Sequence, residues 1–396
     1  MKKKILFMLI NMNIGGTEKA LLNMISEMPK EKYDITLLML EEYGGLLNSI
    51  PQGVKVKYLK GYDRIKETIN NPPQVSAIEF LKKGRIIDTT SLITVHLITK
   101  MKKERSLFYK YILRNYPVLE EEYDAAVAYA GPMDLISYFV IHKIKAKKKI
   151  QWIHFDITKI GFNKKFAERI YRQFDKIFVV SNEGKQKLIE LIPSLKYKTE
   201  KFLNFLSQEQ VLRLAEEGCG FQDDFCGYRI LTVGRLSKEK GQDLTIKVLA
   251  KLKEDGYNVR WYCIGEGRER KEYERLIKEH NLEDDFFLLG AKENPYPFMK
   301  QCDIYVQPSR HEGYCITLAE VRCLNRPIIA TDFTGAKEQI KNGETGIIVP
   351  IDVGEIYHGI NRLLRDKTLR ENLSYNLANK NISSLSKDIQ KITFLL

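Results

Sequence analysis

The chain has 396 residues, of which 44% are hydrophobic and 29% charged, and this composition excludes a disordered chain. At about 150 residues per domain, the length predicts two or three domains. The formal net charge of +13 lies in one half, because residues 1–205 carry 36 basic and 22 acidic side chains, whereas residues 206–396 carry 28 and 29. This split predicts two domains, the first of which faces an anionic partner.

The first half opens with three lysines and an apolar run over 5–10, which together imitate a signal peptide. The run lacks a small-residue cleavage site and is followed by Asn11 and Asn13, so we predict a first strand instead. No run of 18 apolar residues occurs anywhere, so we expect no spanning helix. Strands are predicted in this half over 4–10, 34–40, 125–130, 148–154 and 176–181. Between 62 and 122 the pattern loosens into a stretch rich in Lys and Arg.

The second half alternates strands and helices more regularly. Strands are predicted over 229–234, 258–265, 286–290, 303–308 and 326–331, with helices over 242–256 and 268–280. Such alternation indicates βαβ units and a parallel sheet. The segment 218–227 (GCGFQDDFCG) resembles a linker. We therefore expect an α/β protein with two doubly wound Rossmann-like domains, 1–205 and 206–379, that face a cleft.

The six cysteines all lie in the second half and form no CxxC pair, which is typical of reduced thiols in a cytoplasm rather than of disulfides or zinc ligands. The histidines show no metal-binding spacing, and no D-x-D triplet occurs. We therefore expect no metal.

The segment GRLSKEKG (234–241) lies between a predicted strand and a predicted helix, where ligands bind in open α/β sheets. Arg235 offers a bidentate fork and Lys240 a point charge, a pair that suits a diphosphate. By position alone, a solvated basic turn remains equally open.

Two carboxylates follow the predicted strand 303–308. Glu312 lies in a loop and Glu320 in a helix, about 12 Å apart if all eight steps are helical. That spacing is too wide for one catalytic pair but suits two contacts on an extended ligand, with a phosphate at the helix N-terminus between them. The alternative is an exposed helix residue and a helix cap.

In the first half, Gly15, Gly16 and Thr17 follow the first strand and form either an anion cradle or a tight strand–helix turn. The glycines do not match GxGxxG, which disfavours a nicotinamide cofactor. His154 ends a predicted strand and is expected to point at the cleft, although a histidine there can also be an ordinary loop residue.

Several motifs together resemble the retaining family 4 (group 1) glycosyltransferases of the GT-B class, and more narrowly the members that build capsular and other surface polysaccharides. In the second half they are GRLSKEKG (234–241), GEG (265–267), PSRHEGY (308–314), the Glu312/Glu320 pair and GETGIIVP (343–350). In the first half they are GGTE (15–18), YDAAVAY (123–129), KIQWIH (149–154) and FVVS (178–181). Thr334 departs from the pattern, because many relatives have paired glycines before the equivalent of Glu338.

The resemblance implies roles for particular residues. Arg235 and Lys240 match the positions that hold the donor diphosphate. Glu320 matches the carboxylate that binds the nucleotide ribose, and Glu312 matches the carboxylate that contacts the donor sugar. The backbone N–H groups of Gly313, Tyr314 and Cys315 would lie near sugar and phosphate, and His154 near the reacting centre. The family's proposed mechanism is front-face substitution without a metal or other cofactor, in which the leaving phosphate takes the acceptor's proton.

The implied activity is transfer of a hexose from a nucleotide-diphosphate sugar to a lipid-linked glycan. A UDP-sugar is the commoner donor in this group, with GDP-mannose as an alternative. By resemblance, the C-terminal segment 380–396 would pack back on the first domain. Alternative functions are a sugar-nucleotide epimerase, whose motif order differs, a phosphorylase, which has a much longer chain, and a catalytically silent membrane-docking protein.

Basic side chains gather in three places in the first half: nine between 82 and 115, the lysines at 143–149, and four at 164–172. Anionic membranes attract such patches, so we expect a cytoplasmic protein bound peripherally to the inner face of the membrane. A solvated basic face is the alternative. Nucleic acid is disfavoured because no nucleic-acid module accompanies the charge.

Overall fold

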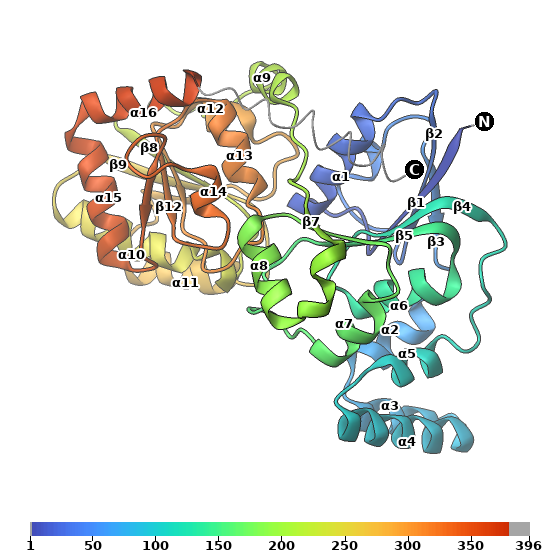
Figure 1. Ribbon diagram of the computed structural model, residues 1–396. Coiled ribbons are helices and arrows are strands. Elements are labelled where there is room, and N and C mark those ends of the chain that lie inside the picture. The colour runs from blue at the N-terminus through green and yellow to red at the C-terminus, as the bar shows by residue number, and fades with distance from the viewer. Residues whose placement is uncertain (1, 380–396) are drawn as a thin grey trace.

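The computed structural model describes residues 2–379, which form two α/β lobes, each built on a parallel sheet (Figure 1). The strands of the first sheet lie between residues 3 and 201, and those of the second between 228 and 349. The lobes are therefore the two Rossmann-like domains that the alternation of strands and helices predicts. The segment predicted to pack back on the first domain, 380–396, lies outside the described residues.

The first sheet has the order β3-β2-β1-β4-β5-β6-β7, with every pair parallel. All five strands predicted in this half are present, and β3 and β7 are added at the two edges. Both are short, and the first three residues of β3 are exposed, so neither shows the apolar run that marked the others. The strands are β1 (Lys3–Leu9), β2 (Tyr33–Met39), β3 (Lys55–Tyr58), β4 (Glu122–Ala128), β5 (Lys145–Ile153), β6 (Lys176–Val179) and β7 (Thr199–Lys201).

Side-chain alternation along β1 divides the first lobe into two cores. Ile5, Phe7 and Leu9 pack in the core that contains the side chains of α1, whereas Leu6 and Met8 pack in the core beneath α6–α8. This follows from the period of two in a strand whose two faces are both covered. The helices are α1 (Gly16–Glu27), α6 (Asp134–Lys143), α7 (Lys164–Tyr171) and α8 (Asn182–Leu191).

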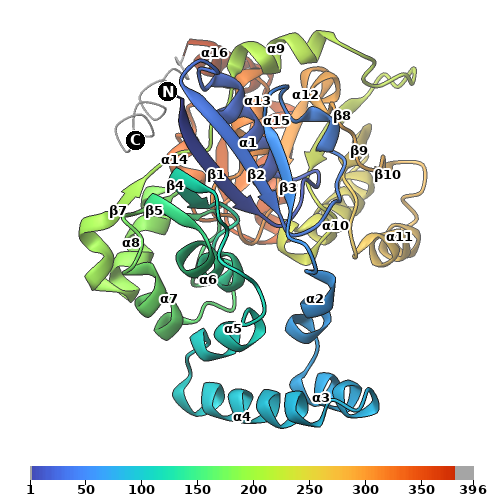
Figure 2. The same cartoon turned by 90° about the vertical axis from the view of Figure 1, so that its right-hand side faces the viewer.

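The irregular stretch 62–122 is largely helical. It contains α2 (Asp63–Asn70), α3 (Pro73–Lys82), α4 (Ile86–Lys102) and α5 (Ser106–Ile112). Figures 1 and 2 show α3 and α4 side by side at the far end of the first lobe, as a hairpin that projects away from both sheets.

The second sheet has the order β10-β9-β8-β11-β12-β13, and it too is entirely parallel. All five predicted strands are present, with β13 added at one edge. The strands are β8 (Tyr228–Val233), β9 (Val259–Ile264), β10 (Phe286–Leu288), β11 (Ile304–Gln307), β12 (Ile328–Thr331) and β13 (Ile347–Val349). The helices are α9 (Gln208–Glu216), α10 (Gln242–Glu254), α11 (Arg270–Glu279), α12 (Tyr296–Gln301), α13 (Ile316–Cys323), α14 (Ala336–Gln339), α15 (Val353–Arg365) and α16 (Lys367–Asn379).

The segment 218–227, which resembles a linker in the sequence, packs on the second lobe instead. The Phe221 ring lies 4.4 Å from that of Tyr262 and 5.1 Å from that of Phe298. Asp223 accepts a hydrogen bond from Tyr262 and pairs with Arg229. The prediction of a linker at 218–227 was therefore wrong. The glycines and acids of this segment suggested a linker, but Phe221 and Asp223 anchor it to the second lobe. The chain passes between the sheets earlier, after β7 and before α9.

Within residues 2–379, no helix combines the length and the apolar character that crossing a membrane requires.

Candidate active site

The strand order places the predicted site loops at the switch points of the two sheets. In the second sheet β8 lies between β9 and β11, so the loops that follow β8 and β11 diverge there. These loops carry 234–241 and 308–315. In the first sheet, β1 and β4 form the corresponding switch point, and Gly15 and Gly16 follow β1. Crevices at such points are where open α/β sheets bind ligands.

Lys240 and Glu312 come from the two loops and meet at the switch point of the second sheet. Lys240 Nζ lies 2.5 Å from Glu312 Oε1, which also accepts a hydrogen bond from Ser309 at 2.8 Å. Burial alone would lower the pKa of Lys240, but the Glu312 carboxylate outweighs burial and the pKa is raised. The amine is therefore a fixed positive charge at this point of the crevice.

Ser309 belongs to a chain of hydrogen bonds that runs back into the sheet. Gln307 donates to Ser309 at 2.8 Å and accepts from Tyr305 and Thr317 at 2.8 and 3.1 Å. The chain holds Glu312 in one orientation, because its acceptor Oε1 is bonded from two sides.

Glu320 lies on the buried face of α13 and is fully shielded from solvent. Its Oε1 accepts a hydrogen bond from Tyr296 at 2.8 Å and lies 3.7 Å from Lys19 Nζ, which belongs to α1 of the first lobe. Its Oε2 is buried and has no hydrogen-bond partner among the described residues. A buried carboxylate oxygen without a donor is costly unless a ligand supplies one. This free acceptor suits the hydroxyl ligand that the sequence predicts for Glu320.

The loop before α13 contacts the first lobe directly. A Cβ on Gly313 would lie 1.9 Å from the His154 carbonyl oxygen, so only glycine allows this approach. The Tyr314 side chain packs against cores of both lobes, and Cys315 is the buried N-cap of α13. Arg235 is exposed beside this loop and forms no ion pair within the described chain, so its guanidinium is available to an anion.

His154 directly follows β5, and its ring is buried rather than exposed in the cleft. The ring packs against Tyr129 and Trp152, with centroids 4.5 and 6.1 Å away. Burial lowers the pKa of His154 to about 3, against smaller upward contributions from the Tyr129 backbone and the Asn204 side chain. The imidazole is therefore neutral at pH 7 and could exchange a hydrogen bond with a ligand but carries no charge.

The predicted anion cradle at Gly15 and Gly16 is occupied by the chain itself. Glu18 folds back so that its Oε2 would lie 2.4 Å from a Cβ on Gly15. Burial raises the pKa of Glu18, with smaller downward contributions from its own backbone N–H and from Arg235. An anion could use this helix N-terminus only if Glu18 were protonated or moved. Gly16 packs against Ile316 of the second lobe, where a Cβ would approach to 2.9 Å.

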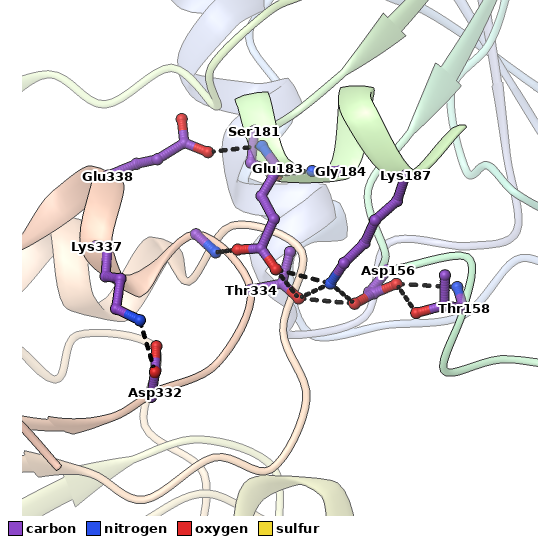
Figure 3. Close-up of polar contacts among 11 residues, drawn as sticks. Asp156, Thr158, Ser181, Glu183, Gly184, Lys187, Asp332, Thr334, Lys337 and Glu338 are labelled. Carbon is purple, nitrogen blue, oxygen red and sulfur yellow. Dashed lines mark hydrogen bonds and ion pairs between the residues drawn. The ribbon is translucent and has the colours of Figure 1, made fainter. Parts of the chain in front are cut away.

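A polar clasp joins the two lobes beside this site (Figure 3). Thr334 of the second lobe donates to Asp156 of the first lobe at 2.7 Å and accepts from Lys187 at 2.8 Å. Lys187 also pairs with Asp156 at 2.7 Å. Burial raises the pKa of Asp156, but hydrogen bonds from Lys187, Thr158 and Thr334 outweigh it and hold the pKa well below its usual range. Thr334, the residue that departs from the family pattern, therefore supplies the hydroxyl at the centre of the clasp.

Glu338, whose role the departure at Thr334 left in doubt, also contacts the first lobe. Its Oε1 accepts from the Glu183 backbone N–H at 3.0 Å, while Glu183 Oε2 accepts from the Gly335 backbone N–H at 3.2 Å. Both contacts extend the clasp along α8 (Figure 3).

Sequence reasoning missed the contacts that cross between the lobes. Lys19 reaches Glu320, and Asp156 and Lys187 reach Thr334, across separations of more than 140 residues. The one sequence signal for these contacts was the position of Asp156, which lies two residues after His154 at the end of a predicted strand. A hollow of about 740 Å³ beside α14 is lined by none of the predicted site residues.

Known proteins resemble this chain in sequence and in fold. Residues 227–380 match the family model described as glycosyl transferases group 1, so the chain carries a domain of this kind. The chain is 32% identical over 211 residues to the N-acetylgalactosamine-N,N'-diacetylbacillosaminyl-diphospho-undecaprenol 4-alpha-N-acetylgalactosaminyltransferase of Campylobacter jejuni, an alignment that covers 53% of this chain and 56% of that relative. It is 27% identical to an uncharacterized glycosyltransferase of Methanocaldococcus jannaschii over 81% of this chain and 82% of that relative.

The fold resembles that of solved structures over nearly the whole chain. A crystal structure of Anabaena HepE in complex with UDP and glucose superposes with a TM-score of 0.71 at 17% identity, covering 99% of this chain and 98% of that one. The fold is thus the GT-B arrangement of two Rossmann-like domains, as the resemblance predicts.

The neutral state of His154 predicts a pH dependence of stability. The folded pKa of about 3 lies below the unfolded value of about 6.5, so below pH 6.5 the unfolded chain binds a proton that the folded chain excludes. Lowering the pH from 7 to 5 should therefore destabilise the wild type by about 2 kcal/mol relative to His154→Gln. Urea unfolding followed by tryptophan fluorescence at both pH values measures this difference. A difference that does not change with pH would contradict a buried, neutral His154.

The clasp predicts that Thr334 controls how tightly the lobes close. Thr334→Val removes a hydroxyl that is bonded on both sides and should weaken closure by about 1–3 kcal/mol. Thr334→Ser keeps the hydroxyl and is the matched control. Small-angle X-ray scattering should show a larger radius of gyration for the valine variant than for wild type and the serine variant. Equal radii for all three proteins would mean that the clasp does not hold the lobes.

Proposed function

We propose that this chain, which carries a group 1 glycosyltransferase domain over residues 227–380, is a retaining glycosyltransferase. It moves a hexose from a nucleotide-diphosphate sugar, with a UDP-sugar as the favoured donor, to a lipid-linked glycan during synthesis of a surface or capsular polysaccharide. The observation that carries the proposal is the gathering of Arg235, Lys240, Glu312 and Glu320 around the switch point of the second sheet.

Each of these side chains offers what one part of the donor requires. The uncommitted Arg235 guanidinium and the Lys240 amine would offset the diphosphate charge, together with backbone N–H groups at Gly313 and Cys315. Glu312 would accept from hydroxyls of the sugar, and the free Oε2 of Glu320 from a ribose hydroxyl. The Campylobacter relative is named for transfer of a sugar to a diphospho-undecaprenol acceptor, and HepE was solved with UDP and glucose. These names support a UDP-sugar donor and a lipid-linked acceptor.

The proposed reaction is a front-face substitution at the anomeric carbon. The bond from the anomeric carbon to the diphosphate oxygen breaks as the acceptor hydroxyl forms its new bond from the same face. The acceptor's proton passes to the departing phosphate oxygen, so no side chain need act as the base. The protein would position both substrates and stabilise charge on the leaving group. Closure of the lobes would keep water from hydrolysing the donor.

Donor entry requires contacts of the closed form to be exchanged. Lys240 is bonded to Glu312, and Lys19 lies against Glu320. The donor diphosphate would compete with Glu312 for Lys240, and the ribose would compete for Glu320. Opening of the lobes withdraws Lys19 from Glu320 because the two side chains belong to different lobes. We therefore propose that the donor binds an open form and that closure follows.

The acceptor would bind the first lobe, where the basic surplus lies. Its anionic lipid diphosphate and the membrane that carries it would both be attracted by this charge. The protein would thus work at the inner surface of the cell membrane. A catalytically silent membrane-docking protein and a GT-B epimerase remain the competing functions.

Substitution of the two carboxylates tests the proposal. Glu312→Gln and Glu320→Gln should each lower kcat by about a hundredfold or more, because each variant loses a negative charge that positions the donor and stabilises the transition state. Glu283→Gln, an exposed glutamate of the same lobe, is the matched control. Release of nucleotide diphosphate is measured across a panel of nucleotide sugars. A wild type inactive on the whole panel, or variants as active as the control, would refute the proposal.

Charge compensation by side chains also predicts that catalysis needs no added divalent cation. Arg235, Lys240 and helix termini would carry the charge that a metal otherwise supplies. The turnover rate in EDTA should equal that in magnesium, while Arg235→Ala should lower it at least tenfold in both. A rate that collapses in EDTA and returns with magnesium would show that the metal does this work.

A further inference from the structure

The α3–α4 hairpin exposes an unusual number of apolar side chains. Of the seventeen large hydrophobic side chains exposed within the described part of the chain, eight lie between residues 75 and 101. Met101 and Ile87 are exposed by 83% and 81%. These eight side chains, which we call the hairpin surface, are Val75, Ile78, Leu81, Ile86, Ile87, Ile93, Leu97 and Met101.

The apolar side chains of α4 form a stripe rather than a scatter. Ile86, Ile93, Leu97 and Met101 recur at intervals of seven, four and four residues, which places them on one face of the helix. Leu92 lies on the far side of the helix, Thr89 lies between it and the stripe, and both are buried. One face of α4 therefore anchors the hairpin, and the other presents hydrocarbon outward.

Lysines border this stripe. Lys100 and Lys102 lie in the last turn of α4 on either side of it, and Lys103 follows directly. Lys82 and Lys83 end α3. The same group of charges continues on α7, because Lys165 Nζ donates to the Lys102 carbonyl at 3.1 Å. The basic clusters that the sequence showed at 82–115 and 164–172 thus form one surface.

The lysine cluster at 143–149 behaves differently. Lys147 Nζ lies 2.8 Å from Asp124, Lys148 Nζ lies 3.6 Å from Asp175, and Lys149 Nζ donates to the Ile141 carbonyl at 2.6 Å. Partners within the chain offset these charges. Around the hairpin, the arginines of the two clusters also pair with acids. The uncompensated charges there are lysines, because no ion pair within the described residues involves Lys82, Lys83, Lys100, Lys102 or Lys103.

We propose that the hairpin surface docks this protein on an anionic lipid bilayer, with the α4 stripe inserted into the interface between headgroups and acyl chains. An outward apolar stripe bordered by lysines is the pattern of a helix that lies in a membrane surface. The hairpin projects beyond the rest of the first lobe, so it meets a flat surface first (Figure 2). A second copy of the chain fits less well, since a two-fold interface would place the same lysines against one another.

This inference rests on the proposed function only in that a lipid-linked acceptor gives the docking its purpose. It adds that hydrocarbon, and not charge alone, holds the protein on the membrane. Attraction by charge is screened at high salt, whereas insertion of apolar side chains is not. The salt dependence of binding therefore separates the two.

The test compares the full chain with an Ile93→Ser/Leu97→Ser/Met101→Ser variant in sedimentation with vesicles. The control variant is Tyr197→Ser/Ile351→Ser/Tyr375→Ser, which removes three exposed apolar side chains elsewhere. Vesicles contain phosphatidylcholine with 30% phosphatidylglycerol or phosphatidylcholine alone, at 0.05 and 0.5 M NaCl. We expect wild type and control to bind the anionic vesicles and to keep part of this binding at 0.5 M NaCl. The hairpin variant should bind at least tenfold more weakly at low salt and not measurably at high salt.

A depth measurement tests insertion independently. The emission of Leu97→Trp should be quenched by vesicles that contain brominated phosphatidylglycerol, whereas that of Tyr375→Trp should not. Equal vesicle binding by wild type and the hairpin variant, or an unquenched Leu97→Trp, would overturn the proposal. So would a wild-type dimer in solution that the hairpin variant converts to a monomer, because the hairpin would then be an interface between copies.

Donor hydrolysis in the absence of vesicles separates this inference from the proposed function. The hairpin variant should hydrolyse the donor at the wild-type rate, because no side chain of the hairpin surface belongs to the site. Loss of vesicle binding with donor hydrolysis unchanged supports the docking surface. Vesicle binding without turnover of any nucleotide sugar would leave the docking surface standing and refute the glycosyltransferase.

Discussion

The position of the first strand inside each parallel sheet is the constraint on which the rest of this structure depends. With β1 beside β4 and β8 beside β11, loops that leave neighbouring strands diverge at the carboxyl edge and open a crevice. Lys240 and Glu312 are 72 residues apart in the chain, yet they meet because β8 and β11 are neighbours. Gly16, which follows β1, faces Ile316 of the second lobe for the same reason. Register and strand order thus assemble a site that no local segment contains.

Close approach of the two lobes is the second requirement, and it depends on small residues. Gly16 lies against Ile316, and Gly313 against the His154 carbonyl, at distances that exclude a side chain. With the lobes this close, charged side chains of one lobe contact polar side chains of the other. Lys19 forms an ion pair with Glu320, and Asp156 accepts a hydrogen bond from Thr334. Under the proposed function, these contacts occupy, or lie next to, the positions of the donor, so donor binding would be coupled to movement of the lobes.

The structure shows which of the surplus basic side chains are paired within the chain and which are not. The half of the chain that carries the donor motifs is nearly neutral. Under the proposed function, two basic side chains and helix termini would offset the charge of the donor diphosphate there. In the first half, Lys147, Lys148 and Lys149 of β5 have partners within the chain, while the lysines of α3, α4 and α7 gather around exposed hydrocarbon. A charge count alone cannot distinguish these two sets, because pairing depends on which strands and helices are neighbours.

The sequence by itself determined the ten principal strands, the parallel α/β class, the positions of Arg235, Lys240 and Glu312 in loops after strands, and that of Glu320 in the following helix. It could do so because apolar runs and glycine-bounded turns are local signals. It mistook 218–227 for a linker, because the packing of Phe221 against Tyr262 leaves no local trace. Over 62–122 it showed only a looser, partly amphipathic pattern, from which the helices α2 to α5 were not assigned. Only the tertiary structure decided which charges meet across the lobes, that the ring of His154 is buried, and that Thr334 joins the two domains. Those properties depend on distances between residues far apart in the chain, which folding alone brings together.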